Sequence, residues 1–269
     1  METRIADGRF GPFEGPATDR VVLPLYASQS TFSGGVLELL GGLLAGGGTL
    51  VDVGAHVGLI SIPVARRTGA RCVAFEPAPL NAACLRRNVE RHGVGQQVAV
   101  HELALSERAG RIAFALCADN SGDNHVLAEG AAPGAARGTV LEVESARLDD
   151  VIDASALAKP IVLKLDVQGA EVKVLTGARN TLQHVSAVVL EYWPSGLLRA
   201  GDHAAQLESL LEVFPWGAVL KQDGSKLEPK PRAELFHALT HFMAHDGSDE
   251  GFFDLLLTSG RDLIERAGS

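Results

Sequence analysis

The sequence predicts an α/β protein with a Rossmann-like, doubly wound sheet. Seven strands are expected, mostly parallel with one antiparallel strand, with helices on both faces. Two observations predict this fold. Short β-rich apolar runs alternate along the chain with longer segments of helical periodicity. The first five runs are apolar enough to be buried on both faces, as strands of a parallel sheet are, and strand, helix, strand repetition implies right-handed crossovers.

The expected strands are short and are bounded by residues that favour turns. In chain order they are Thr49–Val53, Cys72–Phe75, Val98–Glu102, Ile161–Leu165, Ala187–Glu191, Ala218–Lys221 and Phe252–Ser259. The last strand follows a helix expected near Arg232–His245, and such a returning strand can insert antiparallel beside its neighbour. A further β-like run, Arg111–Leu116, interrupts the regular alternation.

Helical periodicity is clearest in four segments, each ended by Gly, Pro or Asn. These segments are Gly58–Thr68, Pro79–His92, Ala170–Asn180 and His203–Val213. A segment rich in Gly, Ala and Asn, residues 119–138, is long enough for a lid, although plain surface loop explains it equally well. Residues 1–35 are expected to be an N-terminal appendage over the carboxyl edge of the sheet and a candidate lid, and residues 36–269 to be a single domain.

Composition excludes several classes of protein. Of the 269 residues 46% are hydrophobic and 21% charged, which indicates a globular chain. The net charge of −9 provides no positive field for a nucleic-acid partner. The 3 cysteines form no CxxC pair, which argues against a disulfide framework and favours a reducing, cytoplasmic location. No stretch has the length and hydrophobicity of a secretion signal or a membrane span.

The most informative stretch is LVDVGAHVG, from Leu50 to Gly58, in which a strand runs into a glycine turn and then a helix. In an open parallel sheet the ligand crevice lies at the carboxyl ends of the strands, so this turn is expected to face it. Gly54 and Gly58 allow the backbone to approach a nucleotide ligand closely and the helix to pack tightly.

Asp52 indicates which nucleotide is bound. A dinucleotide fingerprint aligned on this turn has its first glycine at position 52, whereas the carboxylate found there repels a pyrophosphate. The same carboxylate attracts an amino group or a sulfonium, and S-adenosylmethionine (SAM) carries both and no phosphate. Glu76, at the end of the second strand, can accept hydrogen bonds from both ribose hydroxyls. A merely structural turn with surface acids leaves two acids at successive strand ends unexplained.

These residues, together with the blocks around Asp166 and Glu191, resemble the FkbM family of SAM-dependent methyltransferases. The shared motifs are VDVGAHVG, FEPxPxNxxxLxxN, KLDVxGAE and a following LxGA, in the family's order and spacing between Leu50 and Pro194. The family is similar in fold to class I methyltransferases, which implies a seven-stranded sheet with one antiparallel strand. The chain departs from the family at Gln168, where a glutamate is usual, so a charge-dependent role is not expected there.

The resemblance also implies which residues surround the cofactor. They are Asp52, Gly54, Ala55, Gly58, Glu76, Ala104 and Leu105. The residues before Glu76 would enclose the methionine half of SAM, and Glu76 would hold the ribose. Ala104 and Leu105 follow the third strand and would lie near the flat apolar face of the adenine.

Asp166 is the expected catalytic base. It follows the fourth strand beside the cofactor site, where it would remove the acceptor's proton or orient the acceptor. Its alternative role is to cap the helix that begins near Ala170. His125, in the 119–138 loop, is a rival base because imidazole titrates near neutrality. Glu191 closes the fifth strand and is expected to line the acceptor pocket.

A metal site is not expected. Asp166 with Glu191 supplies oxygen ligands for Mg²⁺, but the sequence shows no third ligand. His237, His241 and His245 share one face of a helix, yet they lack the glutamate of an H-E-x-x-H motif and lie far from the strand ends. A partly exposed stripe or a subunit contact explains them better.

The sequence therefore predicts a SAM-dependent methyltransferase that acts on a hydroxyl of a small molecule, such as a sugar or a polyketide-type natural-product intermediate. Two alternatives stay open. An NAD(P)-dependent Rossmann oxidoreductase is disfavoured by Asp52 and by the absence of a Tyr-x-x-x-Lys pair. A catalytically silent SAM-binding module is disfavoured by the intact cofactor residues and Asp166. Methylation of nitrogen or of a carboxylate also stays open. Because two-fold dimers are the commonest assemblies, a homodimer is expected.

Overall fold

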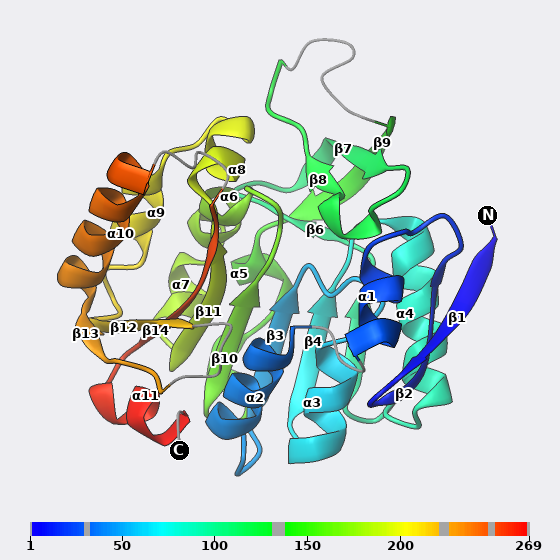
Figure 1. The fold of residues 1–269 in the computed structure, drawn as a ribbon, viewed down its shortest axis with the longest axis horizontal. Helices are drawn as coiled ribbons and strands as arrows, with labels where there is room; N and C mark the ends of the chain where they lie inside the picture. Colours follow the sequence, from blue (N-terminus) through cyan, green and yellow to red (C-terminus); the bar gives the residue numbers. More distant parts are fainter. Residues whose placement is uncertain (1, 30–32, 131–137, 221–225, 247–250, 268–269) are drawn as a thin grey trace.

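The computed structural model describes residues 2–29, 33–130, 138–220, 226–246 and 251–267 (Figure 1). Part of the expected 119–138 loop, residues 131–137, lies outside these ranges, as do residues 30–32 of the expected appendage. Lys221 of an expected strand and the side chain of His245 also lie outside the described part.

The main sheet has eight strands, in the order β13-β12-β14-β11-β10-β3-β4-β5. Their bounds are Lys230–Pro231, Trp216–Leu220, Phe253–Thr258, Ala187–Tyr192, Ile161–Leu165, Thr49–Val53, Arg71–Phe75 and Val98–His101, in the same order. The strands from β11 to β5 run parallel to one another, and β14 is antiparallel to both β11 and β12. The expected mixed, mostly parallel sheet of an α/β protein is thus confirmed.

The number of strands differs from the expected seven, and two strands instead of one run against the parallel set. The additional strand is β13, a two-residue edge strand that pairs antiparallel with β12. Both of its residues, Lys230 and Pro231, are exposed. A strand of two exposed residues is too short to show hydrophobic alternation, so the sequence does not indicate it.

A second sheet of four strands stands beside the carboxyl edge of the main sheet (Figure 1). Its order is β6-β9-β7-β8, and its strands span Ala104–Leu105, Gly138–Ala146, Gly110–Cys117 and His125–Val126. The expected strand Arg111–Leu116 lies within β7. The long partner strand β9 was not expected, because most of its residues are exposed and the alternation that marks a half-buried strand is confined to its end.

Helices cover both faces of the main sheet, as expected. One face carries α2 (Gly34–Leu43), α3 (Ser61–Thr68), α4 (Pro79–Arg91) and α11 (Arg261–Ala267). The other carries α5 (Leu148–Val151), α6 (Glu171–Thr176), α7 (Arg179–Leu182), α9 (Ala204–Leu210) and α10 (Arg232–Asp246). The short helix α8 (Pro194–Arg199) follows β11. Among the described residues no helix is long and apolar enough to span a membrane.

The helix expected over Ala170–Asn180 is divided into α6 and α7. The division falls at Gly177, where the chain passes so close to the second sheet that a Cβ atom would lie 2.1 Å from the Ser106 carbonyl oxygen. Glycine is therefore required at this crossing, and the uninterrupted helical pattern of the sequence did not indicate the contact.

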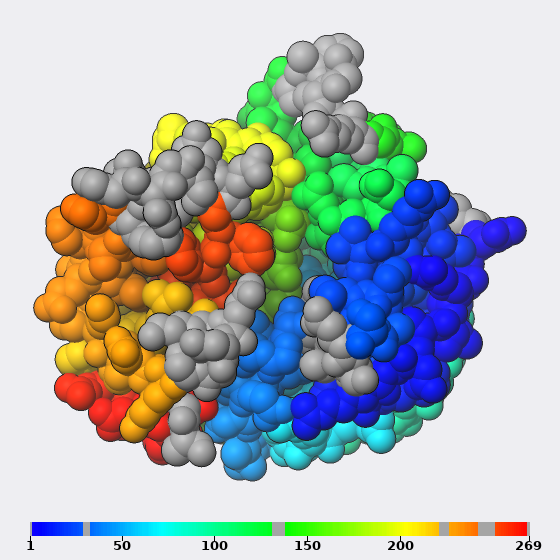
Figure 2. All heavy atoms as spheres, in the orientation of Figure 1, coloured from blue at the N-terminus to red at the C-terminus, as the bar shows by residue number. Residues whose placement is uncertain are grey.

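The N-terminal residues form an antiparallel hairpin, β1 (Thr3–Gly8) and β2 (Gly11–Pro16), followed by helix α1 (Val22–Gln29). The hairpin is fastened to α4, since the Asn88 side chain accepts a hydrogen bond from Glu14 N and donates one to Glu14 O, both at 2.8 Å. Beyond the hairpin, Arg20 N donates to Asp119 O at 2.8 Å, so this segment also touches the second sheet (Figure 2). The division into residues 1–35 and 36–269 stays a prediction.

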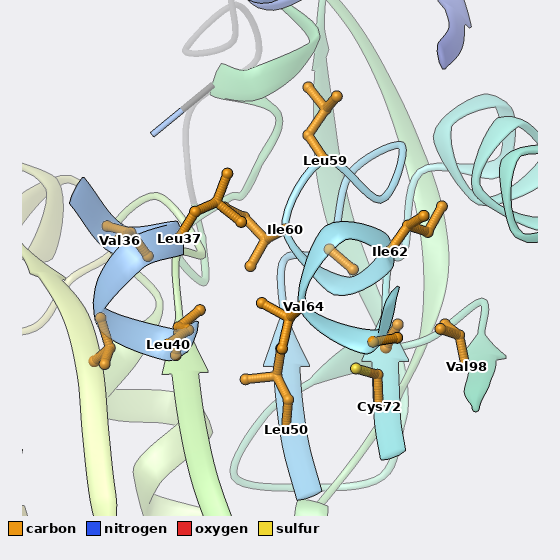
Figure 3. Packing of buried hydrophobic residues seen from close by; sticks show 14 of the residues in the cluster. Val36, Leu37, Leu40, Leu50, Leu59, Ile60, Ile62, Val64, Cys72 and Val98 are labelled. Carbon is orange, nitrogen blue, oxygen red and sulfur yellow. The ribbon is translucent and has the colours of Figure 1, made fainter. Parts of the chain in front are cut away.

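The core consists of two large clusters, one on each face of the main sheet, because successive residues of a strand point to opposite faces. Leu50 of β3 belongs to the cluster beneath α2 and α3, shown in Figure 3, and its neighbour Val51 belongs to the other. Strands buried on both faces read as continuous apolar runs, which explains why these strands were recognisable in the sequence.

Replacement of Leu50 by Ala tests the first cluster. Leu50 is fully buried, so the substitution leaves a cavity, and we expect a loss of about 2–5 kcal/mol in the free energy of unfolding, measured by urea denaturation. Leu198, 59% exposed, is the matched control, with an expected change of about 0.5 kcal/mol or less. Equal losses in the two variants would contradict the placement of the core.

Candidate functional site

A cavity of about 730 Å³ opens at the carboxyl ends of the parallel strands. Its walls come from the residues that follow β3, β4 and β10, from the end of β11 and the start of β14, and from α1 and the second sheet. Parallel strands all end at one edge, so the residues after them converge there although they are far apart in the chain. The cavity is thus where the sequence predicts a ligand.

Lys164 of β10 occupies the floor of this region. Its Nζ lies 3.2 Å from Asp52 Oδ1 and 3.5 Å from Asp166 Oδ2, and it donates a hydrogen bond to Gly54 O at 3.1 Å. Burial acts to lower the pKa of Lys164, but the adjacent carboxylates outweigh it and hold the pKa above its usual value. Lys164 therefore stays charged and links three segments: β3, the turn after β3 and the residues after β10.

Asp52 differs from its expected role as a residue that touches the cofactor. Its side chain is completely buried and does not line the cavity, because one oxygen faces Lys164 and the other accepts a hydrogen bond from Ser61 Oγ. Its register partner across β3 and β10 is Lys164 itself. The charge of Asp52 is thus used inside the protein, to hold Lys164 under the turn.

The two glycines of the turn have different functions. Gly54 lines the cavity at a positive φ of 80°, and a Cβ there would lie 1.9 Å from the Asp166 carbonyl oxygen, so only glycine fits. Gly58 is not among the lining residues; a Cβ at Gly58 would press on Leu85 and Ile62 at 2.6 and 2.8 Å. The expected contact of Gly58 with the cofactor is therefore replaced by helix packing, while Ala55 does line the cavity.

Glu76 lines the cavity as expected and is only 4% exposed. Its Oε2 accepts a hydrogen bond from His56 N and its Oε1 one from Ala78 N, both at 2.9 Å. Burial raises the pKa of Glu76 to about 7, against the lowering effect of these hydrogen bonds. The backbone bonds hold the carboxyl group in place. Oε1 also lies 3.5 Å from the donor Asn81 Nδ2, and Oε2 keeps a lone pair for a further donor.

The expected adenine residues also line the cavity. Ala104 and Leu105 form β6, and Leu103, Phe75 and Phe114 stand in the same wall. This part of the cavity is apolar, as the flat face of a purine requires. The sequence could not show that Phe114, from the middle of β7, joins the wall, because the second sheet was not expected.

Three carboxyl groups gather on the opposite side of the cavity. Asp166 and Glu191 were expected there, and Asp254 of β14 joins them. Asp254 faces Glu191 as its direct partner in the antiparallel pairing of β11 and β14. Its signal in the sequence was a single acid at the start of an otherwise apolar strand, which had no meaning until the antiparallel register was known.

The surroundings of Glu191 and Asp254 make both of these carboxyl groups weaker acids. Burial, reinforced by the charge of Asp166, raises the pKa of Glu191 to about 8 and that of Asp254 to about 6. Gln168 lies between the acids: its Nε2 donates to Asp166 Oδ1 at 2.9 Å and to Glu191 Oε2 at 3.4 Å. The amide at this position thus ties two acids together with a neutral donor.

His125 is not part of the cavity. Its neighbours on either side, Asn124 before β8 and Val126 within it, line the cavity, so in an extended segment the His125 side chain points to the other side. Its Nδ1 donates to the carbonyl oxygen of Asp123 at 2.7 Å. The prediction of a rival base at His125 is therefore not supported by its position.

Potential metal ligands were also located. Within the described ranges one group of three potential ligands occurs, formed by Cys117, Asp123 and His125, away from the acids of the cavity. Asp123 is engaged by the Arg199 guanidinium at 3.2 Å, and burial raises the pKa of the Cys117 thiol to about 11, both of which disfavour a cation. His237 and His241 are exposed on α10, in keeping with the expected stripe.

Comparison with known proteins agrees with this geometry. A family model described as the methyltransferase FkbM domain matches residues 52–212, more than half of the chain. The chain belongs to the FkbM methyltransferase family. The resemblance inferred from the motifs is thereby confirmed, and the protein is a methyltransferase of a SAM-dependent family.

Three relatives show the range of similarity. The chain is 31% identical to methyltransferase sdnD of Sordaria araneosa over 61% of its length, and 29% identical to 2-O-methyltransferase NoeI of Sinorhizobium fredii over 55%. It is 29% identical to 31-O-demethyl-FK506 methyltransferase FkbM of Streptomyces tacrolimicus over 50%. The matched parts cover 71%, 63% and 60% of those proteins, respectively.

Glu191→Gln tests the electrostatics of the acidic wall. A carboxyl group whose pKa is raised on folding destabilises the fold increasingly as pH rises from its unfolded pKa, near 4.5, through its folded pKa of about 8. We therefore expect the variant to raise Tm by about 2–4 °C at pH 8.5 and to change it little at pH 4.5. The exposed Glu212→Gln is the control. Equal Tm changes at the two pH values for Glu191→Gln would contradict the assignment.

Proposed function

We propose that the protein is a SAM-dependent O-methyltransferase that acts on a hydroxyl of a small molecule. The observation that carries the proposal is the division of one cavity into two sides. Glu76 and an apolar wall stand on one side, and Asp166 with Glu191 stands on the other. Two relatives are named for methylation of an oxygen atom, which supports the same chemistry.

The cofactor side fits SAM by its shape and its donor set. Gly54 lets the turn lie directly against the Asp166 carbonyl at the cavity, and Glu76 offers a buried carboxyl group to the two ribose hydroxyls. Ala104 and Leu105 would cover the adenine. The nearby cation, Lys164, is held by Asp52 and Asp166, so within the described ranges the floor offers no unpaired positive charge to a pyrophosphate. This charge balance favours SAM over a dinucleotide.

The chain's own residues would then prepare the acceptor. SAM supplies an electrophilic methyl group, so the protein has to place a hydroxyl oxygen in line and remove its proton. Asp166 suits the role of base: its side chain is 36% exposed to the cavity region, and Lys164 and Gln168 hold its two oxygens in place. Glu191, with a pKa of about 8, is mostly protonated at neutral pH and suits orientation of the acceptor better than removal of its proton.

The alternatives are weaker on the same observations. An NAD(P)-dependent oxidoreductase needs an anion site at the first turn, where Asp52 now lies buried beneath the backbone. A silent SAM-binding module would not require an ordered acid such as Asp166 beside the cofactor cavity.

Binding of S-adenosylhomocysteine, the product form of the cofactor, is the first test. We expect calorimetry to show saturable binding, with no binding of NAD under the same conditions. The Glu76→Gln variant should bind at least about tenfold more weakly, because one of the two carboxyl oxygens is replaced by an amide NH₂ group, which cannot accept a hydrogen bond from a hydroxyl. Binding of NAD alone would overturn the proposal.

Asp166→Asn tests the base. The amide keeps the shape but cannot take a proton, so turnover of an accepted hydroxyl compound should fall by roughly 10²–10⁴. Affinity for S-adenosylhomocysteine should stay within about threefold of the wild type, since Asp166 lies on the acceptor side. Turnover is measured as mass gain of the acceptor across a panel of sugars and polyketide-type alcohols. Full activity of the variant would move the search for the base to Glu191 or Asp254.

A further inference from the structure

A buried chain of hydrogen bonds joins three segments at the cofactor side of the cavity. Asp19 precedes α1, Ser121 lies in the connection between β7 and β8, and His56 stands in the turn after β3. Ser121 Oγ donates to Asp19 Oδ2, and His56 Nε2 lies 2.7 Å from Ser121 Oγ. Asp19 and Ser121 are 1% and 7% exposed.

The direction of the chain follows from its donors. A serine hydroxyl has a single proton, and Ser121 gives it to Asp19, so its bond with His56 requires the proton of the imidazole to be on Nε2. His56 is therefore held as the Nε2–H tautomer. Its Nδ1 is buried and has no hydrogen-bond partner among the described residues, so Ser121 alone anchors the ring by a hydrogen bond there.

His56 connects the chain of hydrogen bonds to the cofactor site through its backbone N–H group. His56 has a φ of 52°, a left-handed conformation that costs free energy for any residue with a Cβ and persists only where the surroundings impose it. In this conformation its N–H donates to Glu76 Oε2 at 2.9 Å. A second path runs in parallel, since Asn81 Nδ2 lies 3.5 Å from both Ser121 O and Glu76 Oε1.

Asp19, at the other end of this chain of hydrogen bonds, is also held in a fixed position. Asp19 Oδ1 accepts the N–H groups of Val21 and Val22 at 2.8 Å each, which caps the start of α1. Val22 packs so closely on the Ser121 segment that a Cβ on Gly122 would lie 2.9 Å from Val22 Cγ2. Both segments line the cavity, so the cap orders a wall of the site and aims Asp19 at Ser121 at the same time.

We infer that Asp19 and Ser121 are positioning residues of the cofactor site: they hold the His56 ring and, through the His56 backbone N–H and Asn81, fix the Glu76 carboxyl group that would bind the ribose. The inference rests on the proposed function for the identity of the ligand. It assigns a part of the cofactor site to residues outside the glycine turn and outside the second strand.

The Ser121→Ala variant tests the consequence for binding. It removes the anchor of His56, and we expect its dissociation constant for S-adenosylhomocysteine, measured by calorimetry, to rise about tenfold. Ser28→Ala is the matched control: Ser28 lies on α1, is exposed, and donates only to Leu25 O, so its affinity should equal that of the wild type. Wild-type affinity in Ser121→Ala, with an unchanged Tm, would overturn the inference.

The Asp19→Asn variant tests the chain of hydrogen bonds itself, without any ligand. The amide oxygen can keep the cap of α1 while the amide nitrogen donates to Ser121, which must then donate to His56. We expect the His56 proton to move from Nε2 to Nδ1, read from the ¹⁵N shifts of histidine-labelled protein, with His56→Gln identifying the signal. A proton that stays on Nε2 in a folded Asp19→Asn variant would contradict the chain of hydrogen bonds.

If the wild type fails to bind S-adenosylhomocysteine, the proposed function fails, while the tautomer measurement still decides whether the chain of hydrogen bonds exists.

Discussion

The arrangement of the site depends on one buried cation. Lys164 stands in β10 directly beside Asp52 of β3, and both side chains are nearly or fully removed from water. An unpaired buried charge costs several kcal/mol, so neither residue is tolerated in this core without the other. Because Lys164 also reaches Gly54 O and Asp166, the pair fixes the distance between the turn after β3 and the acid after β10. The ammonium group of Lys164 therefore sets the position of the two sides of the cavity relative to each other.

The sequence was sufficient for the backbone of the site. The parallel strands around β3 and β10 are buried on both faces and read as continuous apolar runs, so their ends could be located. Gly54, Glu76, Asp166 and Glu191, which were singled out at these ends, all line the cavity. What a strand end does not reveal is the direction of each side chain. Asp52, in β3, points its side chain into the interior, and His125 lies beside lining residues but does not line the cavity. Gly58 follows the turn but packs against Leu85 and Ile62.

Other parts of the site could not be predicted, because they come from pairings between distant segments. Asp254 meets Glu191 only through the antiparallel register of β14 with β11. The second sheet depends on β9, whose exposed, polar strand has almost no hydrophobic pattern. The chain from Asp19 through Ser121 to His56 joins residues 102 positions apart at one bond, and each of them is unremarkable alone in the sequence. Local periodicity contains no information about such contacts.

The position of β14 also has a consequence for how the site comes into being. This strand is inserted between β11 and β12, which precede it in the chain, and it delivers Asp254 to the wall beside Glu191. During synthesis β11 and β12 therefore cannot pair with β14 until the segment after α10 has left the ribosome. A nascent chain that has already paired β3 with β10 therefore still lacks Asp254, one of the three acids of the cavity wall.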